Sequence, residues 1–154
     1  MSSQKPLIID CHGHYTTAPK ALENWRNVQI ANLNTPELGP KVADLKISDD
    51  ELRESIETNQ LRLMKERGSD LTLFSPRASF MAHHIGDFNV SSTWAAICNE
   101  LCYRVSTLFP DHFVPVAMLP QSPGVDPATC IPELEKCVHE YGAVGINLNP
   151  DPSG

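Results

Sequence analysis

The alternation of short apolar segments with longer segments of helical periodicity is the feature that most constrains how this chain can fold. The short segments are apolar on both faces, which is typical of strands buried in a parallel sheet. At least one predicted helix separates each strand from the next, so the pattern indicates parallel strands joined by right-handed crossovers. The predicted strands are residues 7–11, 71–75, 113–119 and 144–148.

Local signals mark the ends of the predicted helices. Ser48 precedes three acidic residues and can form a capping box with Glu51. Gly68 is suited to a left-handed cap after the same helix, and Pro110 ends the next one. Thr129 is expected to cap the last helix. The predicted helices are residues 19–30, 48–67, 92–109 and 129–141.

Apolar residues at helical spacing predict which face of each helix is buried. Cys98 and Cys102 lie one helical turn apart and are interpreted as small apolar core residues, because no further metal ligand accompanies them. The positions expected in the core are Leu52, Ile56 and Leu63, then Ile97, Leu101, Val105 and Leu108, then Ile131, Leu134, Val138 and Tyr141.

Composition limits the class of protein. The 154 residues suffice for one domain with a core, here residues 1–154 with long connections at 15–47 and 76–90. A net charge of −7 without a basic block argues against nucleic acid as the main partner. No apolar run approaches the ~18 residues of a membrane span, which argues against a membrane partner. The start lacks a signal-peptide pattern, and the cysteine count of five is odd, so we expect a cytoplasmic protein with reduced thiols.

The first predicted strand leads directly into Asp10-Cys11-His12-Gly13-His14. Strand alternation is expected to place Asp10, His12 and His14 on one face, where the two imidazoles can reach a single metal ion. Imidazole nitrogen suits Zn²⁺, and Asp10 could orient a ligand from one layer deeper. The same spacing also occurs where no metal binds. A position at the carboxyl end of the first strand favours a site.

Further polar residues follow the ends of the other predicted strands. Arg77 follows the second strand and is suited to binding a carboxylate through two hydrogen bonds, although a surface salt bridge is an equal alternative. His83 lies in the long connection and either takes part in a site or packs in the core. Asn147 and Asn149 share a face at the end of the last strand, where they line a polar pocket or satisfy turn backbone.

Several long motifs resemble one enzyme family. They are IIDCHGHYTTAPKAL, FSPRASFMAHHIGDFNVSSTWAAICNELCYRV, LPQSPGVDPATCIPELEKCV and GINLNPDPSG. From Leu7 onward the chain is similar to the amidohydrolase superfamily, in its decarboxylase/hydratase-like branch. The resemblance implies a (β/α)8 TIM-type barrel and a zinc-dependent hydro-lyase that adds water to a small anionic tricarboxylate. It also implies that His12 and His14 are the first two metal ligands, and it strengthens the interpretation of Arg77 as a carboxylate ligand.

The length of the chain departs from this family pattern. A complete barrel has ~250 residues, whereas four predicted strands correspond to its first half. The family's remaining zinc ligands and acid–base residues belong to later strands, so the catalytic residues stay unassigned and the zinc site incomplete. We expect an N-terminal half that is inactive alone and needs a complementing C-terminal half or self-association. Another hydrolase or decarboxylase of the superfamily, or a non-catalytic self-associating half-barrel with unpaired strand edges, remains an alternative.

Overall fold

The computed structural model describes residues 5–77 and 81–150, which form two short parallel sheets covered by helices. The first sheet has the order β1-β2-β3 and the second pairs β4 with β5, so strands adjacent in sequence are also adjacent in space. This confirms the predicted parallel βα architecture. The strands are β1 (Ile9–Tyr15), β2 (Leu71–Pro76), β3 (Phe113–Pro115), β4 (Ala117–Met118) and β5 (Ile146–Asn147).

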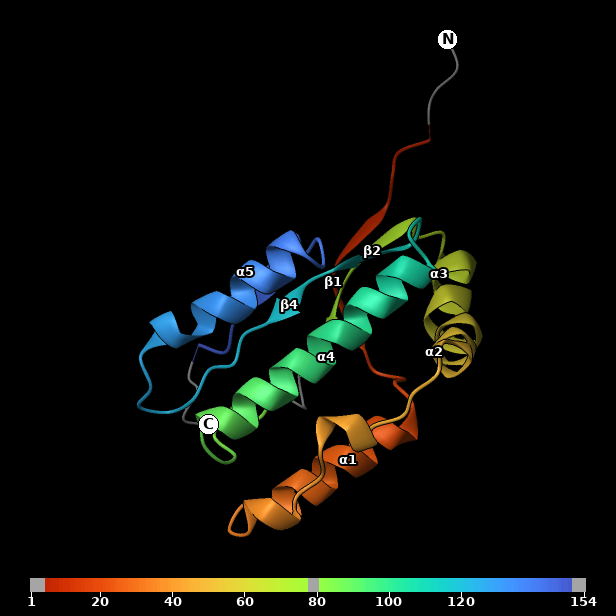
Figure 1. Ribbon diagram of the computed structural model, residues 1–154. Coiled ribbons are helices and arrows are strands. Elements are labelled where there is room, and N and C mark those ends of the chain that lie inside the picture. The colour runs from red at the N-terminus through yellow and green to blue at the C-terminus, as the bar shows by residue number, and fades with distance from the viewer. Residues whose placement is uncertain (1–4, 78–80, 151–154) are drawn as a thin grey trace.

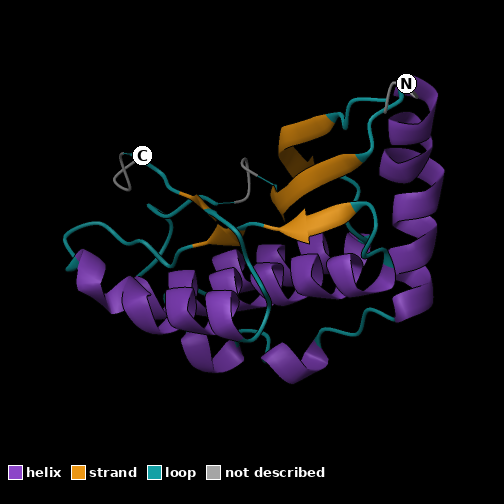
Figure 2. Ribbon diagram, turned by 90° about the horizontal axis from the view of Figure 1, so that it is seen from above, coloured by secondary structure: helices purple, strands orange, loops and turns teal. Residues whose placement is uncertain are grey.

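The helices lie on one side of the strands, and the opposite face of the sheet is open (Figure 2). The long helix α4 runs beside the strands, with α5 on one flank and α2 and α3 on the other, while α1 lies across the end of the molecule (Figure 1). The helices are α1 (Lys20–Ala31), α2 (Asp49–Ser55), α3 (Leu61–Arg67), α4 (Phe88–Leu108) and α5 (Ile131–His139). Short turns are the 3-10 segments η1 (Pro36–Leu38), η2 (Val42–Asp44) and η5 (Pro127–Cys130), and the π-turn η3 (Ile56–Gln60).

A β-bulge in β1 separates the two ends of the histidine motif. Asp10 pairs with Thr72 and Gly13 pairs with Phe74, so three residues of β1 span two residues of β2. The extra residue reverses the alternation. Asp10 and Gly13 therefore share the face of the sheet on which Thr72 and Phe74 lie, although Asp10 itself is exposed, while His12 and His14 face the other way. The prediction that Asp10 shares the face of the histidines is wrong, because period-two alternation holds only in an unbroken strand.

The capping box predicted before α2 is confirmed. The Ser48 hydroxyl accepts a hydrogen bond from the Glu51 backbone N–H at 3.2 Å, and the Glu51 carboxylate accepts one from the Ser48 N–H at 2.8 Å. Gly68 ends α3 with φ of +73°, the left-handed conformation predicted for it.

The π-turn η3 changes the buried face of the predicted helix 48–67. Leu52 and Ile56 are buried as predicted, but the turn that follows contains more residues than an α-helical turn and rotates the next segment. Leu61 and Met64 are consequently buried, whereas Leu63 is only half-buried. Periodicity alone predicted an uninterrupted α-helix here.

The predicted strand 113–119 forms two short strands because its backbone changes partner. The Val116 N–H donates to the Phe74 carbonyl at 2.8 Å, and the next residue, Ala117, donates to the Gly145 carbonyl at 2.9 Å. β5 is correspondingly shorter than the predicted 144–148. The four predicted strands therefore correspond to β1, β2, β3 with β4, and β5.

The core lies between α4 and the strands. On α4 the buried residues include Ile97, Leu101 and Val105 as predicted, and Cys98 and Cys102 are buried among them. Phe74 of β2 contacts the rings of Tyr15 and Phe113, with centroids 5.2 and 4.8 Å away. Packing of aromatic rings between three parallel strands and one helix fixes the strand ends relative to each other.

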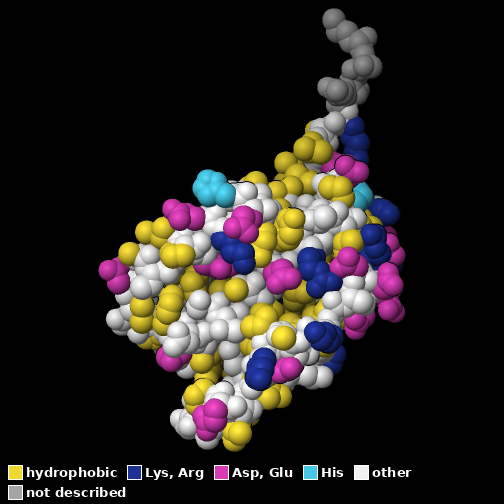
Figure 3. Space-filling view, in the orientation of Figure 1, with side chains coloured by type: hydrophobic (Ala, Val, Ile, Leu, Met, Phe, Trp, Pro, Cys, Tyr) yellow, Lys and Arg dark blue, Asp and Glu magenta, His cyan; other side chains and the backbone are white. Residues whose placement is uncertain are grey.

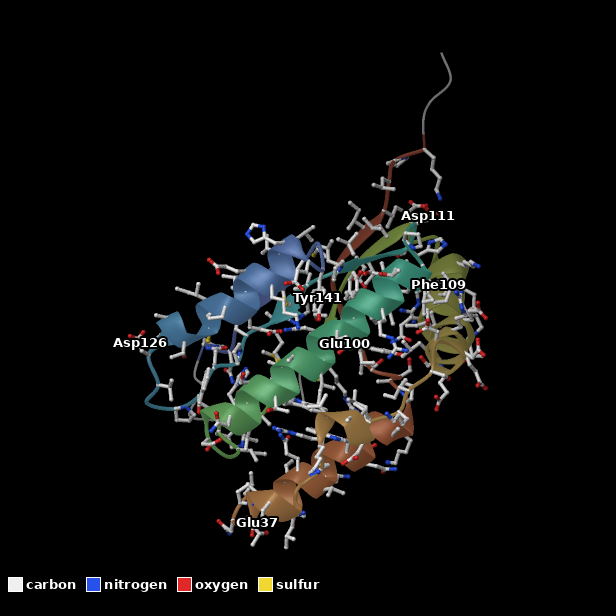
Figure 4. The ribbon with its side chains drawn as sticks, viewed as in Figure 1. Glu37, Glu100, Phe109, Asp111, Asp126 and Tyr141 are labelled. Carbon is white, nitrogen blue, oxygen red and sulfur yellow. The ribbon has the colours of Figure 1, made fainter. Side chains whose placement is uncertain are left out.

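The last helix differs from its prediction. Its segment begins at Asp126, whose carboxylate accepts from the Ala128 N–H at 2.9 Å, and not at Thr129. The 3-10 turn η5 precedes α5. The buried residues here are Cys130 and Cys137, seven residues apart, whereas Ile131 and Val138, which were predicted to be buried, are exposed. Figure 4 shows Tyr141 between α5 and α4, where its ring stacks on Tyr103 at 4.5 Å.

Both outer strands carry exposed apolar side chains. Leu7 and Ile9 at β1 are 65% and 47% exposed, and Val144 and Ile146 at β5 are 61% and 42% exposed. Hydrophobic side chains are visible on the surface near the N-terminal segment (Figure 3). Within the described ranges, no helix is long and apolar enough to cross a membrane.

Candidate active site

His12 and His14 bring their imidazole rings together on the open side of β1. Their Nε2 atoms are 3.1 Å apart, and the ring planes are nearly perpendicular. His12 is exposed and His14 is half-buried. Two ring nitrogens that converge on one point from one strand form a donor pair for a cation.

The other nitrogen of His14 is held by the end of β2. Its Nδ1–H donates to the Pro76 carbonyl at 2.9 Å, and the Ser75 hydroxyl lies 2.8 Å from the same nitrogen. Ser75 itself donates to the Gly13 carbonyl at 2.9 Å. A proton on Nδ1 leaves the Nε2 lone pair of neutral His14 available, which is the tautomer that a metal ligand needs.

The geometry of the pair fits a tetrahedral metal ion. With zinc–nitrogen distances of 2.0–2.1 Å, two imidazole nitrogens on a tetrahedral ion lie about 3.3 Å apart, close to the 3.1 Å between the two Nε2 atoms. A catalytic zinc usually has three protein ligands. Among residues 5–77 and 81–150, no group of three His, Cys, Asp or Glu side chains is arranged to hold a metal. The geometry of the pair is compatible with two of the ligands that such a site would need.

Gly13 allows β1 to pass close to β2 between the two histidines. A Cβ atom at this position would overlap the Thr72 Cγ2 methyl and lie 3.3 Å from the Leu73 carbonyl oxygen. The glycine of the motif is therefore required by packing. The spacing of the histidines is visible in the sequence, whereas the close approach that requires a glycine between them depends on the register with β2.

Tyr15 directly follows the histidine motif but points into the core. Its hydroxyl is 2.6 Å from the Ser55 hydroxyl, and burial raises the pKa of Tyr15 to about 12. The phenol therefore stays protonated at neutral pH. We interpret it as a structural residue and not as a proton-transfer group.

Arg77 lies at the predicted place, directly after β2. It is exposed and lines a narrow cleft with Tyr15, Leu22 and Leu101. The described contacts of the histidine pair involve Ser75 and Pro76, the two residues before it. Arg77 is therefore adjacent in sequence to the groups that orient His14.

His83 is buried and is part of a chain of hydrogen bonds. It is 1% exposed, and its Nδ1–H donates to the Ser91 hydroxyl at 3.2 Å, which in turn donates to the Gln121 carbonyl at 2.6 Å. Burial and the nearby Arg26 guanidinium hold the pKa of His83 below its ordinary value. Neutral His83 thus connects the segment after β2 to the segment after β4, away from the described contacts of the histidine pair.

Asn147 and Asn149 lie at the end of β5. The Asn147 Nδ2 is buried without a hydrogen-bond partner among the described residues. The Asn149 backbone makes two hydrogen bonds of 2.8 Å with the Gln121 side chain, one in each direction. Gln121 and Ser75 were not predicted from the sequence as residues of the site. Ser75 could have been found from the strand register, because it pairs with His14, whereas nothing in the local sequence marks Gln121.

The comparison with protein families decides the classification. A family model described as amidohydrolase matches residues 9–154. The chain belongs to the amidohydrolase family. The parallel βα units and the strand-end histidine pair described above are accordingly part of an amidohydrolase barrel, as the sequence resemblance implied.

Two relatives are similar over almost the whole chain. It is 57% identical over 148 residues to the 2-keto-4-carboxy-3-hexenedioate hydratase of Sphingobium sp. (strain NBRC 103272 / SYK-6), covering 96% of this chain and 43% of that protein. It is 75% identical to the crystal structure of the 4-oxalomesaconate hydratase LigJ from Rhodopseudomonas palustris, with a TM-score of 0.90 and the same coverage of 96% and 43%. The chain thus spans less than half the length of these hydratases and fits their N-terminal half.

A more distant relative contains a metal ion. The dihydroxybenzoic acid decarboxylase of Polaromonas sp. JS666, solved with bound manganese and the inhibitor 2-nitroresorcinol, is 25% identical with a TM-score of 0.61. The match covers 94% of this chain and 39% of the decarboxylase. This amidohydrolase relative of the chain thus binds a metal ion.

Proposed function

We propose that this chain forms the metal-binding half of a zinc-dependent hydro-lyase that hydrates 4-oxalomesaconate. The product would be 4-carboxy-4-hydroxy-2-oxoadipate, a step in the breakdown of protocatechuate or gallate. The observation that carries the proposal is the identity of 57% and 75% to two hydratases over 96% of the chain. The converging Nε2 atoms of His12 and His14 support a metal at the strand end.

In this proposal His12 and His14 hold the ion through Nε2. The Pro76 carbonyl and the Ser75 hydroxyl accept hydrogen bonds from the His14 Nδ1–H, which keeps the proton on Nδ1 and orients the ring. A bound zinc supplies a Lewis acid that activates water or polarises an oxygen of the substrate. Further ligands and the acid–base residues that move protons would come from βα units beyond those described here.

Four residues are proposed to bind the substrate: Arg77, His83, Asn147 and Asn149. The Arg77 guanidinium suits a carboxylate of an anionic tricarboxylate. The unpartnered Asn147 Nδ2 can donate to a carboxylate or keto oxygen at the end of β5. Asn149 adds polar groups close to Asn147. His83 is buried in the segment after β2 and is the fourth residue proposed to bind the substrate. Arg77 and Asn147 are the stronger candidates, because their positions directly follow or end a strand.

The experiment is a hydration assay on a complete barrel. This chain is joined to the remaining βα units of the Rhodopseudomonas hydratase to give a single polypeptide, hereafter the joined hydratase. We expect loss of 4-oxalomesaconate with formation of the hydrated product, abolished by a chelator and restored by zinc. A folded joined hydratase that retains zinc but releases carbon dioxide from the substrate, or leaves it unchanged, would contradict the proposal.

A further inference from the structure

Helix α4 and the segments after β4 and β5 form one hydrogen-bonded network. The Asn99 side chain of α4 donates to the Met118 carbonyl at 2.9 Å and accepts from the Met118 N–H at 2.8 Å. Eight residues earlier on the same helix, the Ser91 hydroxyl donates to the Gln121 carbonyl at 2.6 Å. The helix therefore holds the end of β4 at two backbone positions, three residues apart.

The end of β4 is likewise joined to the end of β5 by hydrogen bonds at two positions. Met118 pairs with Asn147 in the parallel ladder. Three residues after Met118, the Gln121 Nε2 donates to the Asn149 carbonyl and the Gln121 Oε1 accepts from the Asn149 N–H, both at 2.8 Å. The ladder is only two residue pairs long, so the side chain of Gln121 continues the pairing where backbone pairing has stopped.

Asn147 is the last residue of the ladder and lies two residues before Asn149, which Gln121 holds. Its Nδ2 is the donor that is buried without a partner among the described residues. A buried amide donor without a hydrogen bond costs free energy, so such a group requires an explanation. At the carboxyl end of a parallel strand, where barrels of this type place their sites, a ligand oxygen provides that explanation.

We infer that Gln121 is a positioning residue, which holds the end of β5 so that the Asn147 amide can donate to an oxygen of the anionic substrate. Gln121 acts through its double hydrogen bond with the Asn149 backbone and not by touching the substrate. His83 supports it through Ser91, because the His83 Nδ1–H orients the hydroxyl that donates to the Gln121 carbonyl. This inference rests on the proposed hydratase function.

The first test uses this chain alone and does not depend on activity. In Gln121→Met, which keeps the length of the side chain but removes both polar atoms, we expect the Asn149 amide to lose its protection from hydrogen exchange. The side-chain amide signal of Asn147 in the ¹⁵N NMR spectrum is expected to move. Gln121→Glu keeps the acceptor for the Asn149 N–H and is expected to retain part of the protection. Thr129→Val is the control, because it loses one hydrogen bond in the same connection, to the Asp126 carbonyl, without touching Asn149.

The second test measures steady-state kinetics in the joined hydratase. Gln121→Met and Asn147→Leu are each expected to raise KM for 4-oxalomesaconate about tenfold or more, since displacement of a binding group is costly, with kcat and zinc content little changed. Because Gln121 acts through Asn147, the double variant should be no worse than Asn147→Leu alone. A purely structural role would instead lower the melting temperature and zinc content at an unchanged KM.

The outcomes separate this inference from the proposed function. Gln121 does not position Asn147 if the Asn149 amide keeps its protection from hydrogen exchange in Gln121→Met. The same conclusion follows if the two increases in KM multiply in the double variant. If the joined hydratase does not hydrate the substrate, the proposed function fails. The exchange and NMR results on this chain then decide whether Gln121 holds the end of β5: a shifted Asn147 signal supports it and an unchanged one contradicts it.

Discussion

At the residue scale, the account depends on two imidazoles that the sequence separates by a single glycine. His12→Ala and His14→Ala in the joined hydratase are each expected to lower bound zinc and hydration activity together, since each removes one ligand. Elemental analysis gives the zinc stoichiometry. His139→Ala, on the exposed surface of α5, is the matched control and should leave both unchanged. Stoichiometric zinc in the variant that lacks both His12 and His14 would show that the metal binds elsewhere.

Gly13 is the second residue on which the histidine pair depends. Gly13→Ala is expected to destabilise the chain by roughly 1–3 kcal/mol, because the new methyl group overlaps the Thr72 Cγ2 methyl. Thr72→Ser removes that methyl and keeps the hydroxyl. In urea unfolding, the double variant should therefore be more stable than the sum of the two single changes predicts. Strict additivity would mean that Thr72 is not what excludes a side chain at position 13.

Arg77 is the residue proposed to bind a carboxylate of the anionic substrate. Arg77→Met in the joined hydratase is expected to lower kcat/KM for 4-oxalomesaconate at least about tenfold, because a hydrogen bond to a charged group contributes roughly 1.5–3 kcal/mol. Zinc content should stay unchanged. Arg62→Met removes an exposed guanidinium paired with Glu66 on α3 and serves as the control. A loss below twofold for Arg77→Met would remove Arg77 from the site.

At the element scale, the capping box before α2 provides a prediction with a defined pH dependence. Ser48→Ala should lower the free energy of unfolding by about 1 kcal/mol at pH 7. Hydrogen bonds from the Ser48 backbone and side chain lower the pKa of Glu51. A lowered pKa in the folded state means that this stabilisation is complete above the ordinary pKa of glutamate and is lost as the pH falls through the lowered value.

The measurement compares urea unfolding of the wild type and Ser48→Ala from pH 7 down to the acid range. The difference in unfolding free energy between the wild type and Ser48→Ala should become smaller only below the ordinary glutamate pKa of about 4.3. Ser106→Ala, which loses a hydroxyl bond to the Tyr103 carbonyl within α4, should show a difference that does not vary with pH. If the loss of unfolding free energy varied with pH equally in Ser48→Ala and Ser106→Ala, the capping box would not be the origin of the pH dependence.

The elements also show which features local sequence can predict. Ser48, Gly68 and the α4 stripe of Ile97, Leu101 and Val105 were predicted correctly, because caps and helical periodicity act within a few residues. The bulge in β1, by contrast, depends on the register with β2. The face on which Asp10 lies therefore could not be read from alternation alone.

The same distinction applies to the candidate site. The histidine pair and the polar residues after each strand are local signals, and sequence analysis found them. The π-turn η3 and the hydrogen bonds of Gln121 depend on contacts between segments far apart in sequence. On α5, Ile131 and Val138 were predicted to be buried and are exposed, because the face of a helix that packs against the strands depends on tertiary contacts.

At the scale of the whole molecule, the described strands form two short sheets whose outer strands have unpaired edges. The sheet orders β1-β2-β3 and β4-β5 leave β1 with a partner on one side only, and its apolar residues Leu7 and Ile9 are exposed. Unpaired strand edges bind other chains. We therefore expect this chain alone to self-associate and to bind zinc weakly, because two histidines leave the ion short of ligands.

The most direct test of the account is complementation between two separate chains. This chain and the remaining βα units of the Rhodopseudomonas hydratase are produced separately, mixed, and assayed for zinc content, molecular mass by light scattering and hydration of 4-oxalomesaconate. The account predicts that neither chain is active alone, and that the mixture forms a defined complex with one zinc and measurable hydration. A monodisperse monomer of this chain that holds one zinc tightly and hydrates the substrate without the second chain would contradict it.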